Sequence, residues 1–168
     1  MRLLLLLLLL VLGTTTAFAQ APDSLRCLPC GSDCDKATYT KAGNCPHCGM
    51  ALVPAASIRF REVAPDSICA YIQAHPGALL LDVRTKAEFE GKADPDFGTL
   101  KGAINIPIGE LAQRLPELAS HKERAIIVFC SHSHRSPQAA YLLTQNGFTN
   151  VTNLSGGMSV VKEPSCKR

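Results

Sequence analysis

A cysteine at the end of an apolar run is the residue in this sequence best placed to do chemistry. Residues 125–129 read Ala-Ile-Ile-Val-Phe and lead directly into Cys130, and a helical pattern begins at Ser136. A loop between a strand and a helix gathers free backbone N–H groups and lies at the positive end of the helix. Both effects favour the thiolate of Cys130, which is the nucleophilic form of cysteine.

The loop after Cys130 supplies the rest of this candidate active site. Arg135 adds a permanent positive charge at its far side. A thiolate among N–H donors can accept an atom, hold it and pass it on, so Cys130 and Arg135 are the candidate catalytic residues. The alternative for Cys130 is a buried structural cysteine, and the two loop histidines could tune the thiolate or simply face solvent. The candidate loop residues are Ser131, His132, Ser133, His134 and Ser136.

A second group of cysteines lies near the N-terminus. Two Cys-x-x-Cys pairs, at residues 27–30 and 45–48, are each followed by glycine. Two such pairs can close a tetrahedral site, and bound metal would supply folding energy to a segment with little apolar pattern. Zinc is the expected metal, and another soft ion such as Cu(I) is the alternative, as are disulfides between these thiols. The predicted ligands are Cys27, Cys30, Cys45 and Cys48, with Cys34 as an additional candidate.

Length and charge limit the classes of function. The chain has 168 residues, enough for one domain, or one domain with a small module. Its net charge of +3 is small and scattered, and it has no tryptophan. These features argue against a nucleic-acid-binding surface.

The N-terminus has the pattern of a signal peptide. Arg2 precedes ten consecutive apolar residues at 3–12, and Ala17 and Ala19 are small residues before an expected cleavage point at Gln20. We expect residues 1–19 to be removed and the protein to be extracytoplasmic, either periplasmic or secreted. The apolar run is short for a membrane span, although an uncleaved anchor is the alternative. No other stretch is long and apolar enough to cross a membrane.

The elements that must position Cys130 begin near residue 57, where strand and helix patterns start to alternate. This alternation predicts an α/β domain with a mainly parallel sheet flanked by helices. We expect a Cys-rich knuckle at 20–55, the α/β domain at 56–162 and a tail at 163–168. Cys69 is expected in the core and Cys166 in a mobile tail. The expected strands are 58–63, 79–83, 103–108, 125–129 and 151–154. The expected helices are 65–74, 85–91, 108–121 (interrupted near Pro116) and 136–146, and Thr85 with Glu88 predicts a capping box at the start of the second helix.

Residues 57–161 resemble the rhodanese (sulfurtransferase) family. The resemblance is carried by four blocks in the family's order, although Ser133 stands where the family often has glycine. These blocks are Leu80-Leu81-Asp82-Val83-Arg84 with Glu88-Phe89, residues 98–107, the loop from Val128 through Ser136 with its helix, and Val151 through Leu154 with Gly156-Gly157-Met158.

The resemblance implies a persulfide mechanism and a rhodanese-like fold. Cys130 would take sulfur from a small-molecule sulfane-sulfur donor and pass it to a thiol or cyanide, with no cofactor required. Arg135 would orient the loop or the donor, and Asp82 and Arg84 would support the site. Four residues separate Cys130 from Arg135, as in sulfur-handling rhodaneses, whereas the related phosphatases have five.

Residues 43–54 also resemble the heavy-metal-binding segment of bacterial metal-efflux proteins. Two hypotheses therefore remain. The first is an exported sulfurtransferase with a metal-stabilised knuckle. The second is a metal-handling or sulfur-carrier protein that delivers to a protein partner and turns over poorly alone.

Overall fold

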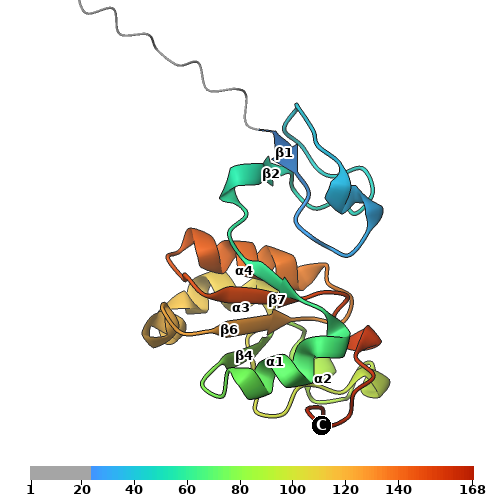
Figure 1. Cartoon of the computed structure of the whole chain (residues 1–168), viewed down its shortest axis with the longest axis vertical. Helices are drawn as coiled ribbons and strands as arrows, with labels where there is room; N and C mark the ends of the chain where they lie inside the picture. The colour runs from blue at the N-terminus through green and yellow to red at the C-terminus, as the bar shows by residue number, and fades with distance from the viewer. Residues whose placement is uncertain (1–23) are drawn as a thin grey trace, which may run out of the picture.

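The α/β part of the chain is built on a five-stranded parallel sheet. A computed structural model describes residues 24–168, so the expected signal peptide at 1–19 lies outside the described residues. The sheet order is β3-β7-β6-β4-β5, and each neighbouring pair is parallel. Figure 1 shows its central strands β7, β6 and β4 side by side. The predicted fold class is confirmed. The strands are β3 (Arg61–Val63), β4 (Leu79–Asp82), β5 (Ile104–Asn105), β6 (Ile126–Phe129) and β7 (Val151–Leu154).

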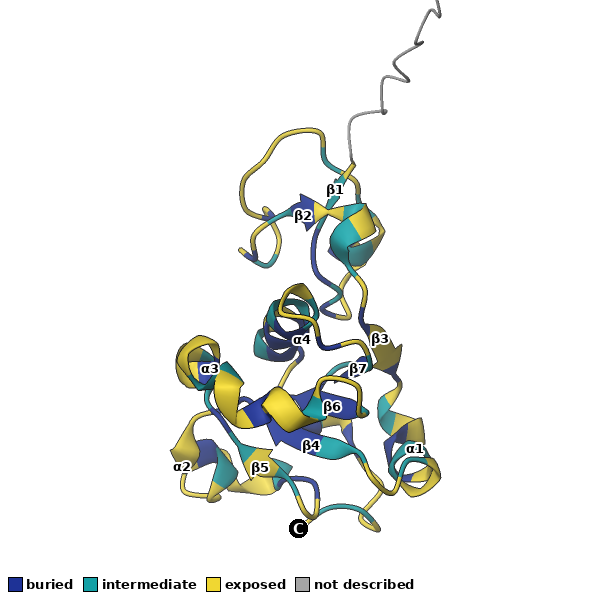
Figure 2. Ribbon diagram, turned by 90° about the vertical axis from the view of Figure 1, so that its left-hand side faces the viewer, coloured by how far each residue is buried: buried dark blue, intermediate teal, exposed yellow. Residues whose placement is uncertain are grey.

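Two apolar cores cover the two faces of this sheet. Along β6, Ile126 and Val128 belong to one core and Ile127 and Phe129 to the other, since successive side chains of a strand point to opposite faces. All four residues are buried (Figure 2), which explains why this strand reads as an unbroken apolar run. The helices are α1 (Ile68–Ala74), α2 (Lys86–Phe89), α3 (Ile108–Arg114) and α4 (Arg135–Gln145).

Local sequence signals account for where the helices begin and end. Thr85 and Glu88 form the predicted capping box at the start of α2, because each side chain accepts the other residue's backbone N–H. The predicted interruption near Pro116 is also present: α3 ends at Arg114 and a 3-10 helix, η5 (Leu115–His121), follows. Shorter 3-10 helices are η3 (Pro65–Ser67), η4 (Pro95–Phe97) and η6 (Met158–Val160).

The Cys-rich segment forms a small lobe beside α4 (Figure 1). Its strands β1 (Leu25–Arg26) and β2 (Val53–Pro54) pair antiparallel, and it contains the 3-10 helix η1 (Asp33–Lys36). The next 3-10 helix, η2 (Ala55–Ser57), joins this lobe to the sheet domain. The hydroxyls of Ser57 and Tyr141 lie 3.1 Å apart, which attaches this connection to α4.

The C-terminal residues are bound to the sheet domain. Cys166 forms a disulfide with Cys69 of α1, with the two Cα atoms 5.4 Å apart. The backbones of Thr99 and Arg168 exchange two hydrogen bonds of 3.0 and 2.8 Å. The expectation of a mobile tail was therefore wrong, because the sequence gives no sign that residues 97 positions apart meet in space. Cys69 is in the core, as expected.

Among residues 24–168, no helix is both long enough and apolar enough to cross a membrane.

Candidate active site and cysteine cluster

Cys130 lies directly after the carboxyl end of β6, at the edge of the sheet where α/β folds bind ligands. Helix α4 begins five residues later at Arg135, so residues 131–134 form the loop that joins the cysteine to the helix. The Cys130 side chain is buried, with 1% of its surface exposed, and its Sγ lies 3.4 Å from the hydroxyl of Ser136. The expected strand–cysteine–loop–helix arrangement is therefore present.

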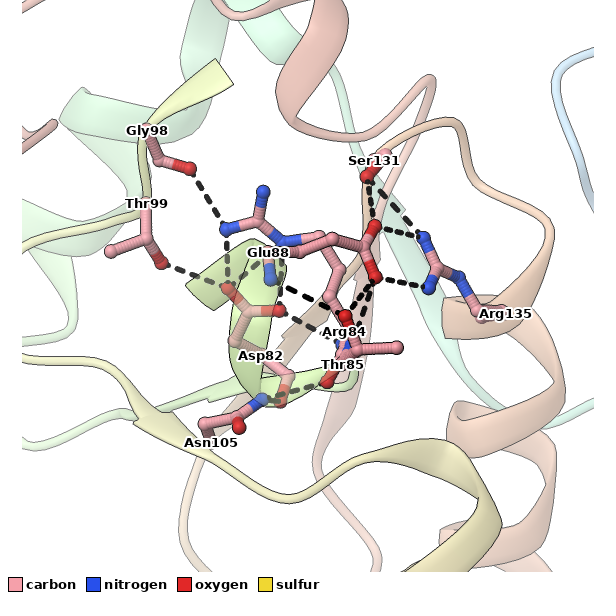
Figure 3. Close-up of polar contacts among 9 residues, drawn as sticks. All are labelled: Asp82, Arg84, Thr85, Glu88, Gly98, Thr99, Asn105, Ser131 and Arg135. Atoms are coloured by element: carbon pink, nitrogen blue, oxygen red, sulfur yellow. Dashed lines mark hydrogen bonds and ion pairs between the residues drawn. The ribbon is translucent and has the colours of Figure 1, made fainter. Parts of the chain in front are cut away.

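Arg135 is held by a carboxylate that the sequence analysis did not assign to the site. Its two terminal nitrogens donate to the two oxygens of Glu88, both at 2.7 Å (Figure 3). Ser131 also donates to Glu88, at 3.0 Å. Arg135 holds the pKa of the Glu88 carboxyl well below its usual range, and Glu88 in turn raises the pKa of Arg135. Arg135 therefore ties the Cys130 loop to α2.

The sequence analysis identified Glu88 as a capping residue and as part of a block similar to the rhodanese family, but gave it no role beside Cys130. Its side chain sits between Thr85 of the capping box and the Cys130 loop, and the residue is 8% exposed. A buried carboxylate requires a cationic or hydrogen-bonding partner. This requirement could have indicated from the sequence that Glu88 pairs with a cation such as Arg135.

Asp82 and Arg84 form a second, fully buried ion pair behind the loop. Arg84 Nη2 lies 2.7 Å from Asp82 Oδ2, and both side chains have no exposed surface. The pair also binds the neighbouring segment: Thr99 donates to Asp82 at 2.9 Å, and Arg84 donates to the carbonyl of Gly98 at 2.8 Å (Figure 3). Asp82 and Arg84 thus join β4 to residues 98–99, which in turn bind the C-terminus.

The turn after β7 packs against the backbone of the Cys130 loop. The N–H of Met158 donates to the carbonyl of Cys130 at 2.8 Å, and the N–H of Ser159 donates to the carbonyl of Ser131 at 3.0 Å. Gly157 lies in this turn and has a φ of +70°. A Cβ at this position would lie 2.4 Å from the Ser131 carbonyl oxygen. Only glycine fits this contact without displacing the loop.

Ser133, which stands where the rhodanese family often has glycine, adopts a backbone conformation that glycine takes easily. Its φ is +55°, a region uncommon for residues with a Cβ. Asn153 of β7 donates to its hydroxyl at 3.1 Å and thereby holds the residue in place. The neighbouring His132 and His134 are exposed, and the ring of His132 contacts Phe97 edge-on, with centroids 5.3 Å apart.

The five N-terminal cysteines come together in the small lobe. The sulfurs of Cys27, Cys34, Cys45 and Cys48 all lie within 4.8 Å of one another. Cys30 is adjacent, with its sulfur 3.5 Å from that of Cys34. This group thus contains three of the four predicted ligands together with Cys34, the additional candidate, whereas Cys30 converges with Cys27, Cys34 and Asp35 in a second group.

The donor set fits a soft metal ion. None of these five thiols is in a disulfide, and four thiolates at about 2.3 Å from one ion suit tetrahedral zinc or Cu(I). Burial raises the pKa of Cys34 to about 12 and opposes ionisation of Cys45 as well. At Cys45, hydrogen bonds from the backbone of Cys48 and His47 and from the Tyr39 side chain act against burial, and the pKa is lowered to about 6. The cluster could therefore hold a metal ion.

Comparison with known families agrees with this geometry. Residues 69–164 match the rhodanese-like domain. The chain belongs to the rhodanese-like family. Residues 32–55 match the heavy metal binding domain, a stretch that contains Cys34, Cys45 and Cys48.

Three relatives show how far the similarity extends. A sulfurtransferase of Allochromatium vinosum is 31% identical over 97 residues, which cover 58% of this chain and 83% of that protein. The uncharacterized protein YqhL of Bacillus subtilis is 42% identical over 80 residues, covering 48% of this chain and 57% of the relative's length. The crystal structure of a rhodanese-related protein from Thermoplasma volcanium has 29% identity and a TM-score of 0.51, covering 64% of this chain and 95% of that one.

Proposed function

We propose that this rhodanese-like protein is a sulfurtransferase that carries sulfane sulfur as a persulfide on Cys130. The observation that carries the proposal is the position of the Cys130 thiol, which is buried after β6 at the start of a loop that Glu88 and Arg135 connect to α2. The similarity to a sulfurtransferase supports the same reaction class.

The reaction needs no external oxidant or reductant. With thiosulfate as donor, the Cys130 thiolate attacks the outer sulfur, a new S–S bond forms, and sulfite leaves with the electron pair of the broken S–S bond. A thiolate or cyanide then attacks the outer sulfur of the persulfide, and Cys130 leaves as the thiolate. The backbone N–H groups of the loop would stabilise charge on the transferred sulfur.

The residues around Cys130 have distinct supporting roles. Arg135 acts as a positioning residue, because both of its terminal nitrogens are engaged by Glu88 rather than directed at a donor. Ser136 lies within reach of the Cys130 sulfur and can donate to its thiolate. Asp82 and Arg84 hold the end of β4 against residues 98–99 through hydrogen bonds.

We also propose that the protein is exported through cleavage before Gln20, to the periplasm or the exterior. The leader-like sequence at residues 1–19 supports this location. The Cys69–Cys166 disulfide is a second supporting feature, because disulfides persist mainly in oxidising compartments. In such a compartment the N-terminal thiols would need a bound metal to stay unoxidised, and we propose zinc.

A metal-handling or sulfur-carrier role is the second candidate function. The five-cysteine cluster and the match to the heavy metal binding domain favour it. A colorimetric zinc assay on protein purified without added metal separates the roles of the cluster. Zinc that is retained and hard to chelate indicates a structural site, whereas readily exchanged copper indicates metal handling.

The decisive experiment is thiosulfate:cyanide sulfur transfer by the wild-type protein beside Cys130→Ser. We expect thiocyanate formation and a one-sulfur mass increase on the peptide containing Cys130, with both lost in Cys130→Ser. Circular dichroism of the variant controls for folding. A folded, reduced wild-type protein that shows neither adduct nor turnover with several sulfane-sulfur donors would refute the sulfurtransferase proposal.

A further inference from the structure

The cysteine cluster contains more donors than one metal ion can use. Besides the four thiols of Cys27, Cys34, Cys45 and Cys48, a second group of four donors converges within the same distance. This second group consists of Cys27, Cys30, Cys34 and the carboxylate of Asp35. The two groups share Cys27 and Cys34, so together they comprise six donors: five thiols and one carboxylate.

Two tetrahedral ions that share two bridging ligands also require six donors. We propose that the cluster holds two metal ions, with the thiolates of Cys27 and Cys34 bridging them. Cys45 and Cys48 complete the coordination of the first ion, and Cys30 and Asp35 complete that of the second. The inference rests on the proposal that this cluster binds metal, and it is independent of sulfur transfer at Cys130.

Asp35 is already oriented toward Cys30. Its Oδ1 accepts the backbone N–H of Cys30 at 3.0 Å and lies 3.3 Å from the Cys30 sulfur, and its Oδ2 accepts the N–H of Gly31 at 2.7 Å. A carboxylate offers about four lone-pair positions, so these backbone bonds fix its direction without exhausting its acceptors. In the metal-free state, the Cys30 thiol proton faces Oδ1 of Asp35. If Cys30 binds a cation as a thiolate, this proton is gone and Oδ1 can bind the same cation.

Charge also favours the second ion. Cys27, Cys30 and Cys34 are all buried, and uncompensated negative charge in such surroundings is costly. If all six donors are ionised, the net negative charge that remains with one divalent cation bound is twice the charge that remains with two bound. The competing arrangement is a single ion in the first group, with Cys30 remaining a protonated thiol that donates to Asp35.

Two of the six proposed donors lie before the segment that matches the heavy metal binding domain. That match begins at residue 32, whereas Cys27 and Cys30 precede it. The Cys27–Cys30 pair therefore supplies one bridging and one terminal ligand that residues 32–55 by themselves do not contain.

Native mass spectrometry of the whole protein, purified after expression of the full chain and titrated with Zn²⁺ under reducing conditions, tests the proposal. We expect two zinc ions per chain for the wild type and one for both Cys30→Ser and Asp35→Asn. Asp33→Asn is the matched control, because Asp33 lies in the same 3-10 helix but its side chain is 99% exposed and contacts Lys36. This control should still bind two ions.

Cadmium-113 NMR of the wild-type protein gives a second readout that does not depend on any variant folding. Two resonances are expected, one from a site with four thiolates and one from a site with three thiolates and a carboxylate. Saturation at one ion per chain, with one resonance, would overturn the two-ion proposal and leave metal binding intact. Binding of no ion would overturn both, while the persulfide assay on Cys130 would report separately on sulfur transfer.

Discussion

At the scale of single residues, the ion pair of Glu88 and Arg135 holds the Cys130 loop in position. Glu88 connects three separate parts of the site: the start of α2 through Thr85, the loop through Ser131, and the start of α4 through Arg135. Charged hydrogen bonds with paired geometry are stronger than neutral ones and define orientation. Glu88 is therefore the residue whose loss should disturb the loop most without touching the thiol.

Glu88→Gln should lower the free energy of unfolding by about 1–2 kcal/mol, because Arg135 loses its charged partner at a partly exposed site. Sulfur transfer should fall as well, since the loop is less well held. Urea unfolding measures the stability change and the thiosulfate assay measures the change in sulfur transfer.

Glu110→Gln removes one of the two exposed carboxylate partners of Arg114, with Glu117 remaining, and should change stability by no more than about 0.5 kcal/mol. Equal effects of the two substitutions would contradict this role for Glu88.

The same carboxyl predicts a dependence of stability on pH. Folding lowers the pKa of Glu88 below its ordinary value of 4.5, so the folded state favours the ionised form. This contribution is complete above the ordinary value and is lost as the pH falls through it toward the lower pKa of the folded state. Urea midpoints measured from pH 7 to pH 3 should show the wild-type advantage over Glu88→Gln shrinking below about pH 4.5. A constant difference across this range would contradict the assignment.

At the scale of elements, the turn between β7 and η6 acts as a support for the Cys130 loop. Gly156 and Gly157 bring the turn so close that backbone hydrogen bonds form from Met158 and Ser159 to the loop carbonyls. The position of the thiol thus depends on a segment more than 25 residues further along the chain.

Gly157→Ala should disrupt this support, because its Cβ would lie 2.4 Å from a backbone oxygen that cannot rotate away. We expect a loss of more than about 1 kcal/mol in stability together with a large loss of sulfur transfer. Gly91→Ala is the matched control: Gly91 has the same φ of +70°, but a Cβ there has open space. It should show only the strain of the positive φ and keep its activity. Comparable activity of both variants would refute the proposed support.

At the scale of the whole molecule, the cysteine lobe and the C-terminal segment both pack against elements that carry the active site. Leu28 and Val53 of the cysteine lobe lie in the same buried apolar cluster as Leu143 of α4. The C-terminal Arg168 binds the backbone of Thr99, which itself binds the buried Asp82. The cysteine lobe and the C-terminal segment therefore add constraints to a domain whose sheet is only five short strands wide.

Cys166→Ser should reveal the contribution of the disulfide. The bridge closes a loop of 97 residues, and its loss is expected to lower the free energy of unfolding by about 2–4 kcal/mol. Thermal unfolding of the variant should match that of the wild type under strong reductant, and reductant should not change the variant further. A wild-type protein indifferent to reductant and equal in stability to Cys166→Ser would show that the disulfide contributes nothing.

Local patterns were sufficient to predict most of the fold. The apolar run ending at Phe129, the Thr85–Glu88 capping box and the interruption near Pro116 each depend on neighbouring residues, and each is present. Element ends shifted by a few residues: β3 begins at Arg61 rather than near residue 58, and the α-helical part of the first helix begins at Ile68 after a 3-10 turn.

The sequence by itself determined the parallel α/β class, the place of Cys130 after a buried strand, and the presence of a thiol-rich lobe, because these follow from periodicity and short spacings. Only the tertiary structure decided which distant groups meet: Glu88 with Arg135, Cys69 with Cys166, and Cys34 with three of the four predicted metal ligands. The physical reason is that such contacts depend on how elements pack and turn in space. A charge or a thiol in the sequence shows that a partner is needed, but the fold determines which partner lies within reach.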